Sequence, residues 1–304
     1  MRILVTGVQG FIGAALAHAA AAQGDEVIGV DRSAQGRALP GELELIEGDI
    51  TDPGRWRTAF DGVDVVMHSA AVHRASEVEG DPIRSIEVNL LGTRLMLETA
   101  ADAGVPCFVY LSSAKAYGEP QSFPSTEDDL LTPVEPYGLA KALGEEYCKH
   151  YAARGSMRCV SVRPFSVYGP GQDLSTGYIG QLIEAWLWSR SATLSGRPDF
   201  LRDFVHIDDV VDVCLAAARD SRGYDVVNAG SGQATSLRDL VRHFTALCGD
   251  RVDSRFSPAR PGTIECTLAD VRRTREFLGR PPIPLVPGLR ETLEWFGARR
   301  NISA

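Results

Sequence analysis

The feature that most constrains the fold is the segment 3–13, where the apolar run Ile3-Leu4-Val5 leads directly into Thr6-Gly7-Val8-Gln9-Gly10-Phe11-Ile12-Gly13. An alanine-rich stretch with helical spacing follows, so the pattern predicts a strand, a tight turn and a helix. Glycines at these three positions permit the turn, a close approach of the backbone to a pyrophosphate, and close packing of helix on strand. Free N–H groups at the start of such a helix attract an anion. We therefore interpret the segment as the cradle of a dinucleotide.

An acidic residue at the end of the next predicted strand supports this interpretation, because a strand-to-helix turn with glycines is otherwise common. The run Glu26-Val27-Ile28-Gly29-Val30 ends in Asp31. A carboxylate in this place contacts the adenosine ribose and repels a 2′-phosphate. The sequence therefore favours NAD over NADP, although the neighbouring Arg32 acts against that preference.

Composition and charge exclude several classes of function. The chain of 304 residues is long enough for one large or two modest domains. Its net charge of −9, with scattered positive charges, argues against nucleic acid as a partner. The six cysteines have no paired spacing, which favours reduced thiols over disulfides or a zinc site. We expect no bound metal.

The N-terminus imitates a secretory signal in one respect, because Arg2 is followed by a charge-free run to Gly24. The glycine spacing, His18 and the strand before the loop instead belong to the fold. No other apolar stretch is long enough to span a membrane. The sequence therefore predicts a cytoplasmic protein without membrane contact.

Strands and helices alternate through the first half of the chain. Further strands are predicted at 43–46, 63–67, 107–111 and 159–162, and helices beginning near residue 52, over 82–104 and over 137–154. This alternation predicts an α/β fold with a doubly wound parallel sheet, the Rossmann arrangement. Ligands of such sheets bind at the carboxyl ends of the strands, which directs attention to Ser112-Ser113 and Arg163-Pro164.

Beyond Pro164 the alternation weakens, and glycine and proline become more frequent. Helical patterns recur at 178–190, 206–219, 235–247 and 286–298, with one strand-like run at 225–227. We predict a Rossmann domain over 1–164 and a smaller α+β substrate domain over 165–304, with part of 203–228 packing back on the Rossmann sheet. In His206-Ile207-Asp208-Asp209, the aspartates that open a helix are interpreted as N-caps rather than metal ligands.

Tyr137 and Lys141 form the second informative pattern, at the start of a predicted helix. A spacing of four residues places both on one helix face. A tyrosine is a poor base at neutral pH, but a cation about 4 Å away at an effective dielectric of about 20 stabilises the phenolate by about 4 kcal/mol, or roughly three pKa units. We therefore expect Lys141 to lower the pKa of Tyr137. Because the chain has only three lysines and eight tyrosines, chance is a poor explanation for the pair.

Together, TGxxGFIG at 6–13, Asp31, Asp49-Ile50, Ser113 and YxxxK at 137–141 resemble the extended short-chain dehydrogenase/reductase family, over nearly the whole chain. The second half carries further marks of its nucleotide-sugar epimerases and dehydratases, at 163–170, 202–209 and 260–262. The resemblance implies a nucleotide diphosphate sugar as substrate and NAD as cofactor.

The resemblance also implies a role for each matching residue. Tyr137 is expected to exchange a proton with a sugar hydroxyl, Ser113 to share that hydrogen bond, and Lys141 to hold the nicotinamide ribose. Contacts with NAD are implied for residues of the glycine loop, of the strand ends and of the catalytic helix, namely Gly7, Gly10, Phe11, Ile12, Gly13, Asp31, Arg32, Asp49, Ile50, Ala70, Ala71, Asn89, Tyr137, Lys141 and Phe165. Contacts with the sugar nucleotide are implied for Ser113, Ser166, Arg202 and Arg260, the two arginines clamping its phosphates.

Some of these residues have a purely structural interpretation. Ser112-Ser113 can simply end a strand. His68 follows a buried strand and is interpreted as a packed, hydrogen-bonded core residue rather than a general base. Asn89 can serve only to hold loop backbone in place.

Two departures from the family pattern bear on the reaction. Dehydratases of the family follow the catalytic Ser or Thr with an Asp-Glu pair, whereas this chain has Ala114-Lys115. The usual Asn of the RxxNxYGP turn is Ser166. We therefore expect NAD-dependent epimerisation at C4 through a 4-keto intermediate. The alternatives are a nucleotide-sugar dehydrogenase, ketoreductase or dehydratase, or a non-catalytic NAD sensor. The resemblance also implies a homodimer, with a helical face on 82–104 or 135–154 as its seam.

Overall fold

The computed structural model describes residues 1–304 except 53, 156, 220–223, 250–251, 260–261 and 301–304. The chain divides into two compact units, each made of separate stretches. The first comprises Met1–Gly118, Leu131–Arg163 and Val211–Val227, and the second comprises Glu119–Leu130, Pro164–Val210 and Asn228–Ala304. The sequence predicted one boundary, after Pro164, between a Rossmann domain and a substrate domain, and this division into domains stays a prediction.

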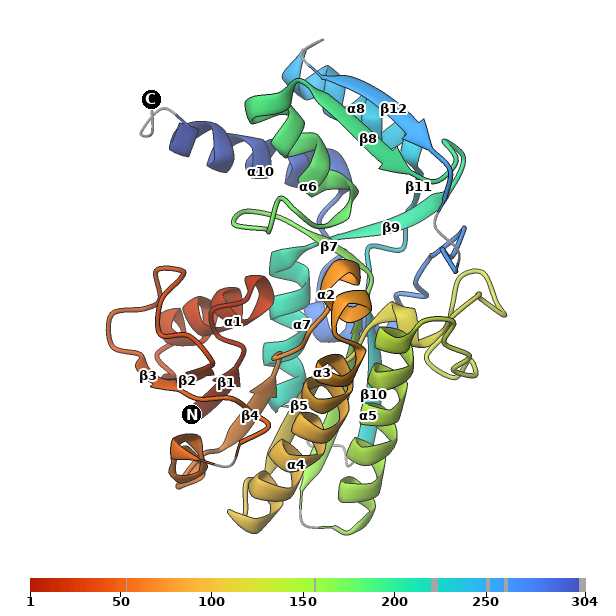
Figure 1. Ribbon diagram of the computed structural model, residues 1–304. Helices are drawn as coiled ribbons and strands as arrows, with labels where there is room; N and C mark the ends of the chain where they lie inside the picture. Colours follow the sequence, from red (N-terminus) through yellow and green to blue (C-terminus); the bar gives the residue numbers. More distant parts are fainter. Residues whose placement is uncertain (53, 156, 220–223, 250–251, 260–261, 301–304) are drawn as a thin grey trace. The chain divides into compact units, whose positions relative to one another are not determined.

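A seven-stranded sheet forms the centre of the first unit (Figure 1). In spatial order the strands are β10 (Tyr224–Ala229), β6 (Arg158–Pro164), β5 (Cys107–Leu111), β4 (Val65–His68), β1 (Arg2–Thr6), β2 (Glu26–Asp31) and β3 (Glu44–Glu47). Every neighbouring pair from β6 to β3 is parallel. All residues of β4 and β5 are buried, as expected for strands covered on both faces. The predicted α/β fold with a parallel sheet is confirmed.

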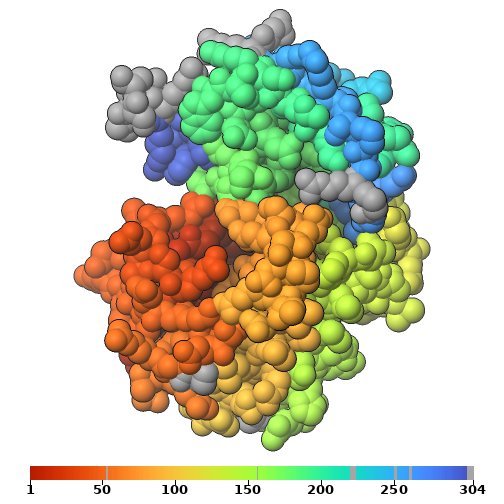
Figure 2. Space-filling model, in the orientation of Figure 1, coloured from red at the N-terminus to blue at the C-terminus, as the bar shows by residue number. Residues whose placement is uncertain are grey.

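Helices cover this sheet. They are α1 (Phe11–Ala22), the 3₁₀ turn η1 (Arg55–Phe60), α2 (Ala75–Gly80), α3 (Pro82–Ile86), η2 (Glu87–Gly92), α4 (Thr93–Asp102), the 3₁₀ turn η3 (Ala114–Ala116), α5 (Pro136–Ala153) and α7 (Ile207–Arg219), whose first turn belongs to the second unit. The helix predicted over 82–104 is therefore interrupted, because η2 is a wider π-helical turn between α3 and α4. Figure 2 shows residues of this stretch in orange at the surface.

The second unit has two small sheets and its own apolar core. Its strands are β7 (Ser166–Tyr168), β8 (Ser191–Ser195), β9 (Leu201–His206), β11 (Ala234–Ser236) and β12 (Asp253–Ser257), and its helices are α6 (Gly177–Glu184) with the π turn η4 (Ala185–Ser189), α8 (Leu237–Cys248), α9 (Arg272–Leu278) and α10 (Leu285–Arg300). The sequence pattern did not predict β9, because the charged pair Arg202-Asp203 interrupts its apolar residues. Both side chains are nevertheless buried.

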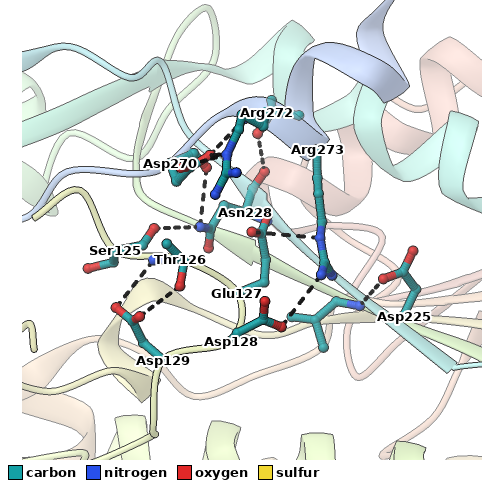
Figure 3. Close-up of polar contacts among 12 residues, drawn as sticks. Ser125, Thr126, Glu127, Asp128, Asp129, Asp225, Asn228, Asp270, Arg272 and Arg273 are labelled. Atoms are coloured by element: carbon teal, nitrogen blue, oxygen red, sulfur yellow. Dashed lines mark hydrogen bonds and ion pairs between the residues drawn. The ribbon is translucent and has the colours of Figure 1, made fainter. Parts of the chain in front are cut away.

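The segment Glu119–Leu130 belongs to the second unit although it lies between β5 and α5 in sequence. Figure 3 shows what holds it there. The Glu127 carboxylate accepts the backbone N–H of Asn228 at 2.9 Å, and the Asn228 amide donates to the carbonyl of Ser125 at 3.0 Å. Arg273 lies 3.9 Å from the Glu127 carboxylate and 3.5 Å from that of Asp128. Because Glu127 and Asn228 are both buried, these bonds fix the segment on the second unit.

Candidate functional site

The glycine loop between β1 and α1 has the geometry of a dinucleotide cradle. Gly7 has a φ of +69°, and a Cβ there would lie 2.7 Å from the Cα of Ala70. A Cβ on Gly13 would lie 2.1 Å from the carbonyl oxygen of Gly7. Side chains at either position would therefore close the space in which loop, helix and strand end meet. Gly10 stands at the N-cap of α1, with Phe11 and Ile12 partly exposed in its first turn.

Asp31 is tied to this loop from the end of β2. Its carboxylate accepts the backbone N–H of Gln9 at 2.9 Å. Arg32 is exposed next to it. No motif of the sequence indicates Arg37, whose backbone N–H donates to the side-chain carbonyl of Gln9 at 2.6 Å. The loop, Asp31 and Ala70 thus lie at the carboxyl ends of β1, β2 and β4, on the same side of the sheet in the first unit.

Other residues implied for cofactor binding lie at neighbouring strand ends. Ala70 and Ala71 follow β4 and are partly exposed, and Ile50 is nearly buried. Asp49 accepts from Thr51 and forms an ion pair with Arg84. Burial acts to raise the pKa of the Asp49 carboxyl, but the bonds from Thr51 and the charge of Arg84 outweigh it and lower that pKa. The Arg84 pairing was not predicted, because it joins residues far apart in sequence.

Asn89 is used for structural bonds. Its side-chain carbonyl accepts the N–H of Val72 at 2.8 Å, and its amide donates to the carbonyl of Val72 at 2.7 Å. It is fully buried. These contacts match the interpretation in which Asn89 holds loop backbone, and the implied contact with NAD stays a prediction.

His68 is a core residue, in agreement with its structural interpretation. It is fully buried, with Nδ1 at 2.7 Å from the hydroxyl of Thr6 and Nε2 at 3.0 Å from that of Thr93. The Thr93 hydroxyl donates to the carbonyl of Asn89, so Nε2 carries the imidazole proton and Nδ1 accepts. Burial, and to a lesser extent the charge of Lys141, lower the pKa of His68 to about 3.

Ser113, Tyr137 and Lys141 all lie in the first unit, at the carboxyl end of β5 and the first turns of α5. Ser113 caps η3 and accepts the N–H of Lys115. Lys141 is almost fully buried, and its ammonium donates to the carbonyl of Leu111 at 2.7 Å. The same nitrogen lies 5.7 Å from the centroid of the Tyr137 ring. The three residues are therefore gathered where a parallel sheet binds its ligands.

The predicted effect of Lys141 on Tyr137 is wrong for this geometry. Burial raises the pKa of Tyr137 above its usual range, and the charge of Glu135 acts in the same direction. The ammonium donates to the Leu111 carbonyl and lies 5.7 Å from the centroid of the Tyr137 ring, and its attraction does not offset burial. Burial also lowers the pKa of Lys141 to about 7, although Cys148 and Glu145 act to raise it.

Lys115 stands where dehydratases of the family carry an acidic residue. It is half-exposed and forms a 2.6 Å ion pair with Glu135, just before α5. Its ammonium lies 5.5 Å from the centroid of the Tyr137 ring. This position therefore presents a cation, not a carboxylate, next to Tyr137.

Two of the residues implied for substrate binding, Ser166 and Arg202, lie in the second unit, whereas Ser113 lies in the first. Ser166 begins β7 and is partly exposed, and Phe165 just before it is largely buried. Arg202, on β9, donates to the carbonyls of Leu201, Ile264 and Glu265 at 2.7–2.8 Å. In the described part of the chain no carboxylate pairs with this guanidinium. Arg260 lies outside the described residues.

His206, Asp208 and Glu291 have potential ligand atoms within 4.8 Å of one another. The N–H of Asp208 points at Nδ1 of His206 at 3.4 Å, which occupies the lone pair of that nitrogen. The carboxylates of Asp208 and Glu291 are both exposed, as acidic groups commonly are without an ion. The N-cap role predicted for Asp209 needs correction, because its carboxylate accepts from Arg280 at 2.6 Å and from the N–H of Ile283 at 2.7 Å.

Within the described residues, no helix combines the length and the apolar character needed to cross a membrane.

Comparisons with known proteins agree with this geometry. Residues 3–230 match the profile of the NAD dependent epimerase/dehydratase family. A UDP-glucose 4-epimerase of Mycolicibacterium smegmatis is 33% identical over 308 residues, covering 97% of this chain and 98% of the relative. The structure of MoeE5 in complex with UDP-glucose and NAD has a TM-score of 0.90 and 34% identity, covering 99% of this chain and 100% of MoeE5. TunA, an NAD-dependent NDP-hexosamine 5,6-dehydratase involved in tunicamycin biosynthesis, has a TM-score of 0.90 and 30% identity, with 98% of each chain covered.

Proposed function

Because this chain belongs to the NAD dependent epimerase/dehydratase family, we propose that it is an NAD-dependent epimerase that inverts C4 of a nucleotide diphosphate sugar. The observation that carries this proposal is the position of Ser113, Tyr137 and Lys141. They lie together at one strand end, in the same unit as the glycine loop. A site that only sensed NAD would need the loop but not these three side chains.

In this mechanism Tyr137 accepts the proton of the C4 hydroxyl and later returns it, while Ser113 shares the hydrogen bond. NAD, held by the glycine loop and Asp31, would supply reversible hydride acceptance at C4 and would not be consumed. The Lys141 ammonium, fixed on the Leu111 carbonyl, supplies positive charge close to Tyr137. Because burial disfavours the phenolate, proton transfer to Tyr137 is energetically uphill, and the nearby charge of Lys141 reduces this cost without cancelling it.

Arg202 is proposed to bind the substrate phosphates. Among the described residues this guanidinium donates to three carbonyls and to the Tyr178 hydroxyl, so no carboxylate balances its charge, which favours a diphosphate. Arg260 is proposed as its partner from the family resemblance. Ser166, shorter than the usual Asn, is proposed to leave room for the sugar to turn between the two hydride transfers.

Water elimination is the second candidate reaction, since TunA is a dehydratase of similar structure. The residues after Ser113 argue against the acid/base pair of the 4,6-dehydratases. Ala114 has no proton to exchange, and Lys115 is paired with Glu135. A dehydrogenase or ketoreductase would use the same three residues but would have to exchange its cofactor at every turnover.

A homodimer in the cytoplasm is part of the proposal. Large apolar side chains are exposed on neighbouring helices of the first unit, with exposed fractions of 70% for Ile83, 53% for Leu91 and 51% for Leu139. α3 and η2 pack against α5, so these side chains belong to adjoining helices (Figure 2). A second copy of the chain would remove this apolar surface from water.

The test is incubation with UDP-, dTDP- and GDP-sugars without added NAD(H), followed by NMR of the products. We expect equilibration of C4 epimers, and its loss in Tyr137→Phe with bound NAD retained. Stoichiometric release of NADH, or a stable keto-deoxy sugar, would overturn the epimerase assignment. Absence of turnover with every sugar would favour the NAD sensor.

A further inference from the structure

A buried ion pair joins α5 to β6 next to Ser112, the residue that precedes Ser113. Arg163, at the end of β6, donates from Nε to the Glu145 carboxylate at 2.9 Å and from Nη2 at 2.6 Å. The exposed fractions of these side chains are only 4% and 2%. Burial acts to lower the pKa of Arg163, but the bonds and charge of Glu145 raise it above its ordinary range. The guanidinium of Arg163 therefore keeps its charge in the interior of the protein, against the Glu145 carboxyl group.

The same carboxylate also holds the end of β5. The hydroxyl of Ser112 donates to the Glu145 oxygen that Arg163 Nε contacts. Ser112 lies between Ser113 and Leu111, whose carbonyl accepts from Lys141. Glu145 follows Lys141 by one helical turn, so both project from the same face of α5 toward this strand end. One carboxylate thus joins α5 to the end of β5 and the end of β6, within one helical turn of Lys141 and one residue of Ser113.

Glu145 can contact the end of β5 because α5 packs closely on that strand. A Cβ on Gly144 would lie 2.2 Å from the hydroxyl of Tyr110. The helix therefore approaches the strand more closely at Gly144 than a side chain would permit. Lys141 lies 4.8 Å from the centroid of the Tyr110 ring at the same contact.

Net stability is a weak explanation for this arrangement. Taking two charges out of water costs about as much as their attraction returns, and apolar replacements of similar volume are often as stable. A carboxylate with three directional bonds, in contrast, fixes the relative position of the groups that donate to it.

We infer that Glu145, held by Arg163, is a positioning residue, which locks the end of β5 onto α5 so that Ser113 and Lys141 keep one geometry relative to Tyr137. It touches neither sugar nor cofactor and acts only through its neighbours. The inference rests on the proposed function and adds to it a residue that the family motif quoted above does not include.

The first test removes the link from Glu145 to the strand while the ion pair stays intact. Ser112→Ala should lower kcat by about 10-fold with little change in KM, bound NAD or melting temperature, since small displacements of catalytic groups slow catalysis strongly. The matched control is Ser161→Ala, a buried serine of β6 outside this network, which should leave kcat unchanged. A wild-type kcat in Ser112→Ala, or an equal loss in both variants, would overturn the inference.

The second test separates positioning from stability. The double variant Glu145→Met/Arg163→Met replaces both charges by apolar side chains and should fold. Its kcat should nevertheless fall by about 10- to 100-fold. Full activity in a folded double variant would show that the pair is only structural. If this variant does not fold, the Ser112→Ala comparison decides.

A third test measures the titration of Lys141 by NMR and needs no turnover. Lysine labelled with ¹³C at Cε gives three signals in this chain, one of them from Lys141. In the holoenzyme Glu145→Gln should move the titration midpoint of Lys141 to lower pH, because a negative charge that supports the ammonium is lost. Tyr110 and His68 from the sheet, and Tyr137 and Cys148 from α5, also face this ammonium and are unchanged.

The NMR result distinguishes two failures. If no sugar is turned over but the midpoint moves, the proposed function is wrong and the network stands. If the wild-type enzyme is an epimerase and the midpoint of Lys141 is the same in Glu145→Gln, the positioning role is wrong.

Discussion

Arg163 in the first unit and Arg202 in the second are both buried arginines on strands, but their surroundings differ. Arg163 is bonded to the carboxylate of Glu145, so its charge is balanced inside the protein. Arg202 is bonded to three backbone carbonyls, with the ring of Tyr178 at 5.6 Å. Carbonyl dipoles orient a guanidinium but do not neutralise it. An arginine that is internally balanced fixes structure, whereas one that is only oriented remains able to bind an anion.

The largest effect expected from this difference is on stability. Arg163→Met leaves the buried Glu145 carboxylate without its cation, so the free energy of unfolding should fall by about 3–5 kcal/mol. Arg202→Met leaves carbonyls without donors and should cost about 1–3 kcal/mol. Urea titrations of both variants measure this difference.

Arg158 provides the matched control on the same strand as Arg163, because it donates to the carbonyls of Ala217 and Ala218. Arg158→Met should resemble Arg202→Met in its cost. Equal stability of Arg163→Met and Arg158→Met would remove the distinction between balanced and oriented arginines.

A second effect is the pH dependence of stability that arises from His68, a buried residue of the first unit whose polar atoms are hydrogen-bonded inside the protein. The pKa of His68 is about 3 in the folded state and near 6.5 when the chain is unfolded. The unfolded chain binds the additional proton in this window, so the stability present above pH 6.5 should be lost as pH falls toward 3, by a few kcal/mol in total. Denaturation of wild type and His68→Gln across this range should show a flatter dependence for the variant. Parallel curves would contradict the role given to His68.

The smallest effect is on ligand affinity in the second unit. Arg202→Met should weaken binding of UDP by about 2 kcal/mol, or about thirtyfold, because a charge-assisted contact is lost, while NAD binding persists. Arg197→Met is the control, since Arg197 is exposed and already paired with Glu265 at 2.9 Å. Isothermal titration should give unchanged affinity for that variant. Unchanged affinity in Arg202→Met would place the phosphate site elsewhere.

The same contrast between local and distant partners explains what the sequence could predict. The glycine loop and the Tyr137–Lys141 pair depend on residues close in the chain, so their spacing carries the information. The Glu145 network joins three elements across the sheet, and nothing local distinguishes Glu145 from a solvent-exposed glutamate of a helix. The sequence did not predict β9 because the groups that hydrogen-bond the buried side chains of Arg202 and Asp203 come from distant segments of the chain. The pKa of Tyr137 was predicted in the wrong direction because burial depends on the complete fold.

The division of the first unit among three stretches has a consequence for synthesis on the ribosome. β10 is the edge strand beside β6, and it ends at Ala229, after roughly three quarters of the chain. Until that point the nascent sheet ends at β6, whose outer N–H and C=O groups lack a strand partner. An open edge of this kind pairs readily with other chains. The nascent protein therefore has a period of vulnerability that closes only when β10 emerges, and ribosome pausing before Tyr224 should increase aggregation more than pausing after Ala229.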